Sequence, residues 1–528
     1  MNRTARLASP VRVPHSPSTL RLHYKRQAHN AQTDQIGEKP QIIGGWWHYQ
    51  GQVTTETNLN HAGATSNLTV SLTNETQVDE IVGGNYLKMA AALKGKPHTA
   101  TIGDTNVTIN AVKTEYIVAG SKANNAGKGS IVNGNTNLVI NDGLIQYEVD
   151  ETKGAVVGGN YIKATNNGGG QVSQTNSTVG KTSVTINGGT VNGSVYGGSY
   201  AENYADTDTP DMALKLTTAN SSLVINGGEF SGYVAAGSGI KGQGTTGTTV
   251  STSVTINAAA GKTITLQGMP KSDTTKSSKS ILIGGDHVAN RGKSVIEGDT
   301  SVTVTGEGTI TLGKGIVGGS YVAENMRGTG GKYTASEIKG TTNILVDAAN
   351  VTVNDEVIGG TYLRQTVKDT DKDSFVSATV GSTNLILKAG TFKSNVIAGG
   401  KSNDYTGGLS SDVLGDTSLT ITGGTYEAAV LAGGSAKAGQ GDAANKRVVS
   451  ANVKGTARVN VTGGTLNGIV GGGLSYLYTS SALTDAVVTT HVENVVANIT
   501  GGTINTMDHN SGLDGFGIPA TVVGAMAQ

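Results

Sequence analysis

The sequence predicts an all-β chain that winds into a parallel β-helix, and three observations support this fold class. A phrase with two glycines returns along the chain with a mean period of about 39 residues. A second phrase, which alternates apolar and polar residues, keeps the same period. Glycine makes up 78 of the 528 residues, about twice its average usage, whereas aromatic residues reach only 4%. Narrow coils with an aliphatic core and glycine corners account for this composition.

The first phrase is an aliphatic or aromatic residue, two glycines, a small polar residue and often tyrosine. Clear copies lie at 82–86, 157–161, 196–200, 317–321 and 358–362. Glycine tolerates tight backbone geometry that other residues avoid, so the phrase is better explained as a corner of the coil than as a binding motif. The predicted structural corners are Gly84, Gly159, Gly198, Gly319 and Gly360.

The second phrase reads as a half-buried strand. At 183–189, Val184 and Ile186 point to one side and the polar residues to the other, which is a period of two. The Gly-Gly pair then ends the strand, because glycine adopts a positive φ freely. Another strand signal follows at 191–196, and a third precedes each unit, as at 377–381. We therefore expect three short strands and three glycine corners per unit. About twelve stacked turns would make a rod of roughly 60 Å, or longer if each unit winds twice.

The domain organisation follows from the extent of the repeats. Residues 1–40 predict a disordered basic leader, because 1–33 carry Arg and Lys but no acid, and no apolar signal-peptide stretch follows. Residues 41–528 form the repeat array. The segment 521–525 resembles one more copy of the first phrase, and no capping sequence follows it. We therefore expect an array that is truncated at the C-terminus.

Composition excludes several function classes. The chain has no cysteine, which excludes a disulfide scaffold and a thiolate metal site. Its 39 basic and 39 acidic residues give no net charge, so a basic nucleic-acid-binding face is not indicated. No run of about 18 apolar residues predicts a membrane-spanning helix. The nine histidines do not recur in phase, and no enzyme motif stands out.

Two loops rich in aspartate could bind calcium, the only cofactor that the sequence suggests. Alternate carboxylates in a loop are how many calcium sites begin. The candidate metal ligands are Asp206, Asp208 and Asp211 in one loop, and Asp369, Asp371 and Asp373 in the other. Counted from Asp369, the EF-hand glycine and glutamate positions hold Ser374 and Val380, so a solvated loop is the favoured interpretation.

Tyrosines recur at equivalent repeat positions and are the candidate carbohydrate-binding residues: Tyr86, Tyr161, Tyr200, Tyr321 and Tyr362. Stacked turns would make Tyr161 and Tyr200 neighbours. A row of rings could bind sugar faces, but a structural ladder that shields the corners is the favoured alternative. Aspartates in a recurring Gly-Asp-Thr phrase predict corner hydrogen bonds and not an active site: Asp104, Asp299 and Asp416.

The alternation of Thr-Ile-Asn-Gly-Gly-Thr with Val-Tyr-Gly-Gly-Ser at 185–199 resembles the passenger regions of bacterial autotransporters and related adhesins, with a pertactin-like architecture. The resemblance covers about 480 residues of the repeat array. It implies a right-handed parallel β-helix at the cell surface or outside the cell, associated with the outer membrane. Such proteins normally carry a secretory signal, which is not visible here. They also carry a translocating β-barrel, which would lie downstream of this sequence.

These observations predict a non-enzymatic secreted or cell-surface protein that serves adhesion or surface display. The expected partners are host or cell-surface glycans or proteins. One alternative is a polysaccharide lyase or glycoside hydrolase on the same fold, which a patch of acidic and basic side chains across adjacent turns would favour. Another is a structural surface filament, which regular end-to-end polymers would favour.

Overall fold

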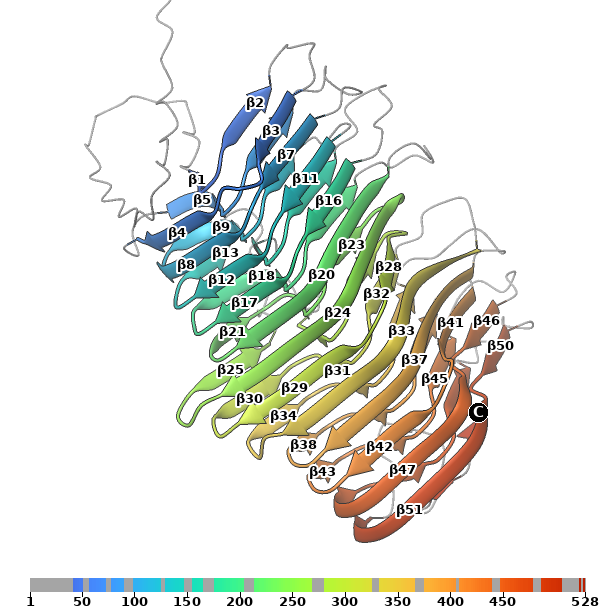
Figure 1. Cartoon of the computed structure of the whole chain (residues 1–528). Helices are drawn as coiled ribbons and strands as arrows, with labels where there is room; N and C mark the ends of the chain where they lie inside the picture. Colours follow the sequence, from blue (N-terminus) through green and yellow to red (C-terminus); the bar gives the residue numbers. More distant parts are fainter. Residues whose placement is uncertain are drawn as a thin grey trace, which may run out of the picture.

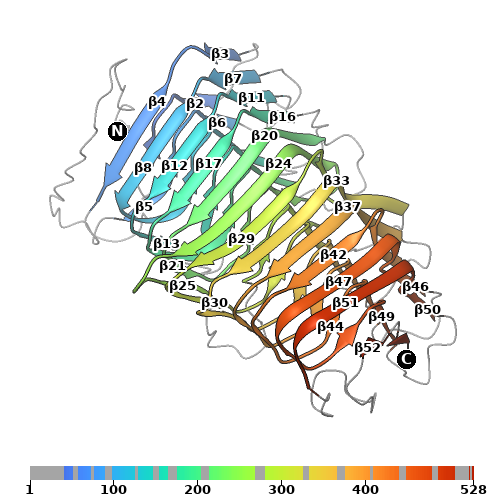
Figure 2. The same cartoon turned by 60° about the horizontal axis from the view of Figure 1, so that its bottom comes forward.

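The chain forms a parallel β-helix. The computed structural model describes residues 41–50, 57–72, 77–89, 98–124, 129–146, 154–164, 175–203, 213–267, 280–324, 332–365, 375–404, 408–438, 447–477, 486–505, 522–523 and 526–527. Within these ranges there is no helix, and the strands form one sheet of 40 and another of 13 strands. Figures 1 and 2 show the strands stacked side by side along a rod, from blue at one end to red at the other.

Each repeat of the sequence is one coil of the β-helix, called a rung below. Ile81 pairs in parallel with Ile42 on one side and with Ile117 on the other, at separations of 39 and 36 residues. The pairing of Val156 with Ile117 and with Val195 continues the same row. Twelve steps along the 13-stranded sheet, at about 4.8 Å each, correspond to a rod of about 58 Å. The predicted period and the single winding per unit are confirmed.

A rung has four strand positions, one more than the sequence predicted. The strand position that the sequence did not predict begins at the tyrosine of the Gly-Gly-Ser-Tyr phrase, as in β19 (Tyr200–Asn203). It is only four residues long, and the sequence after it is polar. The alternation of apolar and polar residues therefore extends over too few positions to predict a strand. These fourth strands form the smaller sheet: β2 (Trp47–Gln50), β6 (Tyr86–Met89), β10 (Lys122–Asn124), β15 (Tyr161–Ala164), β19, β23 (Gly239–Lys241), β27 (His287–Ala289), β32 (Tyr321–Glu324), β36 (Tyr362–Gln365), β40 (Lys401–Asp404), β45 (Ser435–Ala438), β49 (Leu474–Leu477) and β53 (Met526–Ala527).

The first and second positions form one long wall, because several strands run through both without a break. Strands at the first position alone are β3 (Thr57–His61), β7 (His98–Ile102), β11 (Gly129–Asn133), β16 (Thr175–Val179), β28 (Lys293–Ile296), β41 (Gly408–Val413), β46 (Arg447–Ser450) and β50 (Ala486–Thr489). The second position contains β4 (Ser66–Ser71), β8 (Thr105–Ala111), β12 (Thr136–Ile140), β17 (Thr182–Ile186), β20 (Leu214–Ile225), β24 (Thr245–Ala258), β29 (Thr300–Gly306), β33 (Lys332–Asp347), β37 (Phe375–Leu387), β42 (Thr417–Ile421), β47 (Val453–Leu466) and β51 (Val492–Ile504).

The third position leads to the Gly-Gly corner. It contains β1 (Ile42–Ile43), β5 (Gln77–Val82), β9 (Lys113–Val118), β14 (Gly154–Val157), β18 (Thr190–Tyr196), β22 (Val234–Ala235), β26 (Leu282–Ile283), β31 (Ile316–Val317), β35 (Val357–Ile358), β39 (Val396–Ile397), β44 (Val430–Leu431), β48 (Ile469–Val470) and β52 (Val522–Val523). Short strands precede it in several rungs: β13 (Leu144–Gln146), β21 (Gly228–Phe230), β25 (Thr263–Leu266), β30 (Thr309–Leu312), β34 (Val351–Val353), β38 (Thr391–Phe392) and β43 (Thr425–Tyr426).

The two glycine phrases need glycine for different reasons. After the second phrase, Gly189 has φ 93° and Gly424 has φ 91°, as predicted. The corners of the first phrase show no such φ; there, a Cβ would meet the next rung. An added Cβ would lie 2.3 to 3.0 Å from the nearest atom of that rung at Gly84, Gly159, Gly198, Gly319 and Gly360. These five glycines therefore stand at corners because adjacent rungs approach each other closely.

The Gly-Gly corner bends inward until it contacts the long wall, which divides the interior into two cores. A Cβ on Gly83 would lie 2.4 Å from the Val107 side chain of that wall. At the equivalent contact in a later rung, the Thr300 hydroxyl donates to the carbonyl oxygen of Gly318 at 2.6 Å. One core lies between the second and third positions and includes Ile186; the other lies between the first and fourth and includes Leu214. On its outer side, the same bend leaves a concave angle between the third and fourth strands.

Buried polar side chains form a ladder along the inner side of the corner. Each accepts a hydrogen bond from a backbone N–H of the preceding rung, as Asn160 does from Ser121 at 2.7 Å. The ladder contains Asn85, Ser121, Asn160, Ser199, Ser238, Asp286 and Ser320. Asp286 carries the one carboxyl group in this set. Burial raises its pKa to about 6, although hydrogen bonds from Ser294 and from the Ser238 N–H oppose the rise.

Candidate functional site

The concave angle outside the Gly-Gly corner is the candidate functional site, and we call it the corner groove. One wall is the outer face of the third-position strands, and the other is the outer face of the 13-stranded sheet. Side chains from the two walls contact each other: the Tyr196 and Tyr200 rings, which flank the corner, lie 5.2 Å apart. Apolar residues of the groove form a cluster separate from both cores, including Val157, Ile283, Val317, Ile358 and Leu431.

The five predicted tyrosines all lie in one row of this groove. The parallel register places Tyr86, Lys122, Tyr161 and Tyr200 at successive positions, and Tyr321 beside Tyr362 further along. Tyr161 and Tyr200 stack with ring centroids 5.1 Å apart, so their predicted contact is confirmed. The Tyr321 and Tyr362 rings meet edge-on at 5.3 Å.

Burial divides these tyrosines into two groups. Tyr86, Tyr161 and Tyr321 are buried, with exposed fractions of 2%, 7% and 1%. A ring so covered has no free face for a sugar. These three tyrosines therefore fit the structural alternative, in which stacked rings shield the corners. Tyr200 and Tyr362 are partly exposed and keep a surface that a ligand could contact.

Further aromatic side chains enter the groove from positions that the sequence did not single out. Tyr233 lies with its ring 5.5 Å from Tyr321 and 3.9 Å from the His287 ring. Tyr116 meets the ring of Tyr161 edge-on at 6.2 Å. Tyr116 lies in a third-position strand, Tyr233 directly precedes one, and His287 stands at the position of the repeated tyrosine. Their location in the groove can be recognised only when the rungs are aligned.

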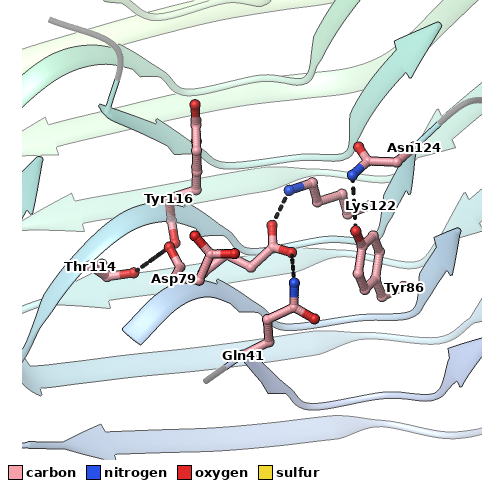
Figure 3. A network of polar contacts seen from close by, with 8 residues as sticks. Gln41, Asp79, Tyr86, Thr114, Tyr116, Lys122 and Asn124 are labelled. Atoms are coloured by element: carbon pink, nitrogen blue, oxygen red, sulfur yellow. Dashed lines mark hydrogen bonds and ion pairs between the residues drawn. The ribbon is translucent and has the colours of Figure 1, made fainter. Parts of the chain in front are cut away.

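Near the N-terminal end, the groove holds a buried ion pair surrounded by rings, which we call the closed cluster: Glu80, Tyr86, Lys122 and Asn124. Lys122 donates to the Glu80 carboxylate, which also accepts from Gln41 at 2.9 Å. The Asn124 amide donates to the Tyr86 hydroxyl at 2.9 Å. Figure 3 shows Lys122 reaching between Asn124, Tyr86 and Tyr116 toward this carboxylate.

A second cluster repeats the same residues at the same strand positions seven rungs later: Glu356, Tyr362, Lys401 and Asn403. Lys401 donates to Glu356 and lies 5.1 Å from the centroid of the Tyr362 ring. The equivalent distance from Lys122 to Tyr86 is 5.5 Å. The Asn403 amide donates to the Tyr362 hydroxyl at 3.5 Å, a longer bond than in the closed cluster. We call this copy the open cluster.

Two tyrosine rings of the closed cluster have no equivalent in the open cluster. In the closed cluster, the Tyr116 and Tyr161 rings lie 5.3 and 5.1 Å from the Lys122 ammonium. Tyr116 pairs with Glu80, whereas the register puts Asn395 beside Glu356. Tyr161 pairs with Lys122, whereas the serine at 435 pairs with Lys401. With these smaller side chains beside it, the tyrosine of the open cluster, Tyr362, is partly exposed, although Lys401 is still buried at 9% exposure.

A hollow of about 340 Å³ lies at the open cluster, within the size range of small-ligand sites. Tyr321 and the partly exposed Tyr362 line it, and so do Ile281, Val317 and Ile358. Charged and polar side chains complete its lining: Lys314, Asp355, Glu356, Arg364, Ser394, Lys401 and Asn403. The groove is therefore filled by side chains at the closed cluster and hollowed at the open cluster, seven rungs further along.

The charges in this hollow are not all paired. Burial opposes the charge of Lys401, but Glu356 and Tyr362 outweigh it, so the Lys401 pKa is raised. The Arg364 guanidinium is half-buried and hydrogen-bonds to the Tyr321 hydroxyl. Among the residues that the structure describes, neither Arg364 nor Lys314 forms an ion pair. An alignment of the rungs would have revealed Lys122 and Lys401, because each lies at the position of the repeated tyrosine. The same alignment would have drawn attention to Arg364, two residues after Tyr362.

The remaining sequence-predicted sites fall into two groups. Asp104, Asp299 and Asp416 accept backbone N–H groups of the next rung at 2.7 to 2.8 Å, which confirms the predicted corner hydrogen bonds. The calcium candidates lie outside the described residues: Asp206, Asp208, Asp211, Asp369, Asp371 and Asp373. In the described ranges, no three His, Asp or Glu side chains gather as a metal site would require.

The described part of the chain contains no helix with the length and apolar character that a membrane crossing requires. Comparison of the chain with protein-family models, with curated proteins and with solved structures finds no match.

Proposed function

We propose that this chain is the β-helical part of a non-enzymatic secreted or cell-surface protein, similar to an autotransporter passenger, that binds host or cell-surface glycans through the corner groove. The stacked rungs give a stiff rod, because neighbouring strands are hydrogen-bonded along its whole length. A rod of this kind suits the presentation of a binding surface away from the cell. The resemblance of the repeats supports a location outside the cell, at the outer membrane.

The observation that carries this proposal is the hollow at the open cluster. It combines a partly exposed ring, Tyr362, with charged and hydrogen-bonding groups from three successive rungs. Sugars are bound in this way, with an apolar ring face against an aromatic side chain and the hydroxyls bonded to polar groups. The closed cluster has the same residues, but its tyrosine, Tyr86, is only 2% exposed, so it serves as an internal comparison.

A matched pair of substitutions tests the proposal. Tyr362→Ala removes the ring of the open cluster, and Tyr86→Ala removes its buried equivalent in the closed cluster. We expect Tyr362→Ala to abolish binding to a glycan array and to host cells with a small change in melting temperature. Tyr86→Ala should lower the melting temperature and leave binding intact. Equal binding by both variants and the unchanged protein would contradict the proposal.

The hollow also gives specific support to a second candidate function, a polysaccharide lyase or glycoside hydrolase. Asp355, Glu356, Arg364 and Lys401 come from adjacent rungs and line one space, as the active sites of such enzymes require. Incubation with a panel of polysaccharides, followed by measurement of new reducing ends and of ultraviolet-absorbing unsaturated sugars, separates the two functions. The binding proposal predicts no product; release that is lost in Glu356→Gln would favour the enzyme.

A further inference from the structure

We infer that the hollow binds an acidic sugar residue, a hexuronic acid within a polysaccharide, and that Arg364 binds its carboxylate. This inference rests on the proposed function and names the ligand class of the same site. Three cations line the hollow, and they differ in their partners. Lys401 forms an ion pair with Glu356, whereas Arg364 and Lys314 have no carboxylate partner in the described structure.

The environment of Arg364 suits a carboxylate. Its guanidinium is half-buried on the outer face of β36, where a charge without a counter-ion is costly. The Tyr321 hydroxyl occupies part of its hydrogen-bonding capacity. The planar group has five N–H donors, and two of them can hold both oxygens of one carboxylate. Lys314, which is exposed at the rim, adds a second positive charge to the same hollow.

The closed cluster indicates the size of what is missing from the open one. There, two tyrosine rings lie against the Lys122 ammonium. At the open cluster, Asn395 and Ser435 stand in their places, and the Asn395 side chain turns to accept from the Ala429 N–H at 3.2 Å. The hollow that Lys401 and Ser394 help to line, of about 340 Å³, is large enough for a small ligand.

The chemistry of the lining favours a sugar ring over an aromatic one. Asp355, Ser394 and Asn403 offer hydrogen-bond acceptors and donors around the space, and a sugar has hydroxyls to match them. The partly exposed Tyr362 ring provides a flat surface for the apolar face of the sugar. A ring with hydroxyls and one carboxylate thus matches the ring surface, the polar groups and the unpaired guanidinium.

Isothermal titration with two matched oligosaccharides tests the inference on the full chain. One is a hexuronic acid oligomer, and the other is the same oligomer with its carboxyl groups reduced to primary alcohols. We expect the acidic oligomer to bind at least tenfold more tightly, because a hydrogen bond to a charged group contributes about this factor or more. Arg364→Ala should remove this preference, and Arg364→Lys should retain part of it. Lys437→Ala is the control, since it removes a cation from the same outer row of the sheet but outside the hollow.

Several outcomes would overturn the inference. Equal affinity of the unchanged protein for both oligomers would do so, and so would an acidic preference that survives in Arg364→Ala. If only the reduced oligomer or other neutral glycans bind, the acidic ligand is wrong while the proposed function stands. If no glycan binds in the titration or on the array, both fail. Circular dichroism of Arg364→Ala checks its fold, and the preference of the unchanged protein remains decisive if that variant does not fold.

Discussion

Replacing the buried carboxyl of Asp286 with an amide should stabilise the middle of the rod at neutral pH. Asp286 is fully buried at the inner side of the corner. One carboxylate oxygen accepts from the Ser238 N–H at 2.6 Å, and the other accepts from the Ser294 hydroxyl. Burial raises the Asp286 pKa from 3.8 to about 6. The folded protein therefore holds this proton more tightly than the unfolded chain does.

The sign and size of the effect follow from this shift. Because the folded-state pKa is the higher one, protonation stabilises the fold, and the stabilisation is lost as the pH rises from about 4 through 6. Raising the pKa from 3.8 to about 6 corresponds to about 3 kcal/mol of differential stability. Asp286→Asn removes the titration. Its advantage over the unchanged protein should be near zero at pH 4 and about 3 kcal/mol at pH 7.5.

The chain itself shows that asparagine fits this position. Asn160 occupies the same ladder, and its oxygen accepts from the Ser121 N–H at 2.7 Å. Its amide donates to the Ser177 hydroxyl at 3.0 Å, and the register places that serine in the same row as Ser294. Asp286→Asn can therefore keep the bond from the Ser238 N–H and replace the bond from Ser294 with one that the amide donates to the Ser294 hydroxyl. Asn160→Asp is the reciprocal control and should introduce a pH dependence at its own rung.

Amide hydrogen exchange measures the result locally, which suits a long repeat protein whose rungs open separately. Exchange of the amides of β23, β27 and β32 between pH 4 and 8, corrected for the intrinsic rate, gives the opening free energy of these rungs. If Asp286→Asn keeps the pH dependence of the unchanged protein, Asp286 is not the group that titrates in these rungs.

Three other substitutions test the packing of the rungs. Thr300→Val removes the hydroxyl that donates to the Gly318 carbonyl, and we expect a loss of about 1–3 kcal/mol by hydrogen exchange; an unchanged opening energy would refute this. Gly319→Ala puts a Cβ 2.9 Å from the next rung and should lower the melting temperature, whereas Gly63→Ala, with open space around it, should not. Lys122→Ala leaves the buried Glu80 unpaired and should cost about 3–5 kcal/mol. Lys339→Ala, at an exposed ion pair, should leave the melting temperature unchanged, and equal effects of the two lysine variants would contradict the assignment.

The sequence predicted the coil because its local signals recur. Val184 and Ile186 alternate with polar residues and are buried as expected. The period also predicted the contact between Tyr161 and Tyr200, since both follow the same phrase at the same offset. The glycines revealed the corners, although those of the first phrase are needed for close approach and not for a positive φ.

The groove could not be predicted in the same way, because it depends on the pairing of rungs of unequal length. Lys122 follows Glu80 by 42 residues, whereas Lys401 follows Glu356 by 45, so no constant spacing marks the two clusters. The fourth strand was also too short to predict from the sequence. Because its outer face forms one side of the groove, the groove could not be predicted without it. Differences at single positions, such as Asn395 in place of Tyr116, then decide which cluster is open.

Adding rings next to the open cluster should close the hollow. Asn395→Tyr combined with Ser435→Tyr supplies the two rings of the closed cluster, one next to Ser394 in the sequence and one paired with Lys401, and both of these residues line the hollow. We expect this double variant to lose glycan binding, measured by isothermal titration with the oligosaccharide that the unchanged protein binds, and to keep or raise its melting temperature. Undiminished binding by this double variant, with its fold intact, would contradict the claim that the hollow is the ligand site.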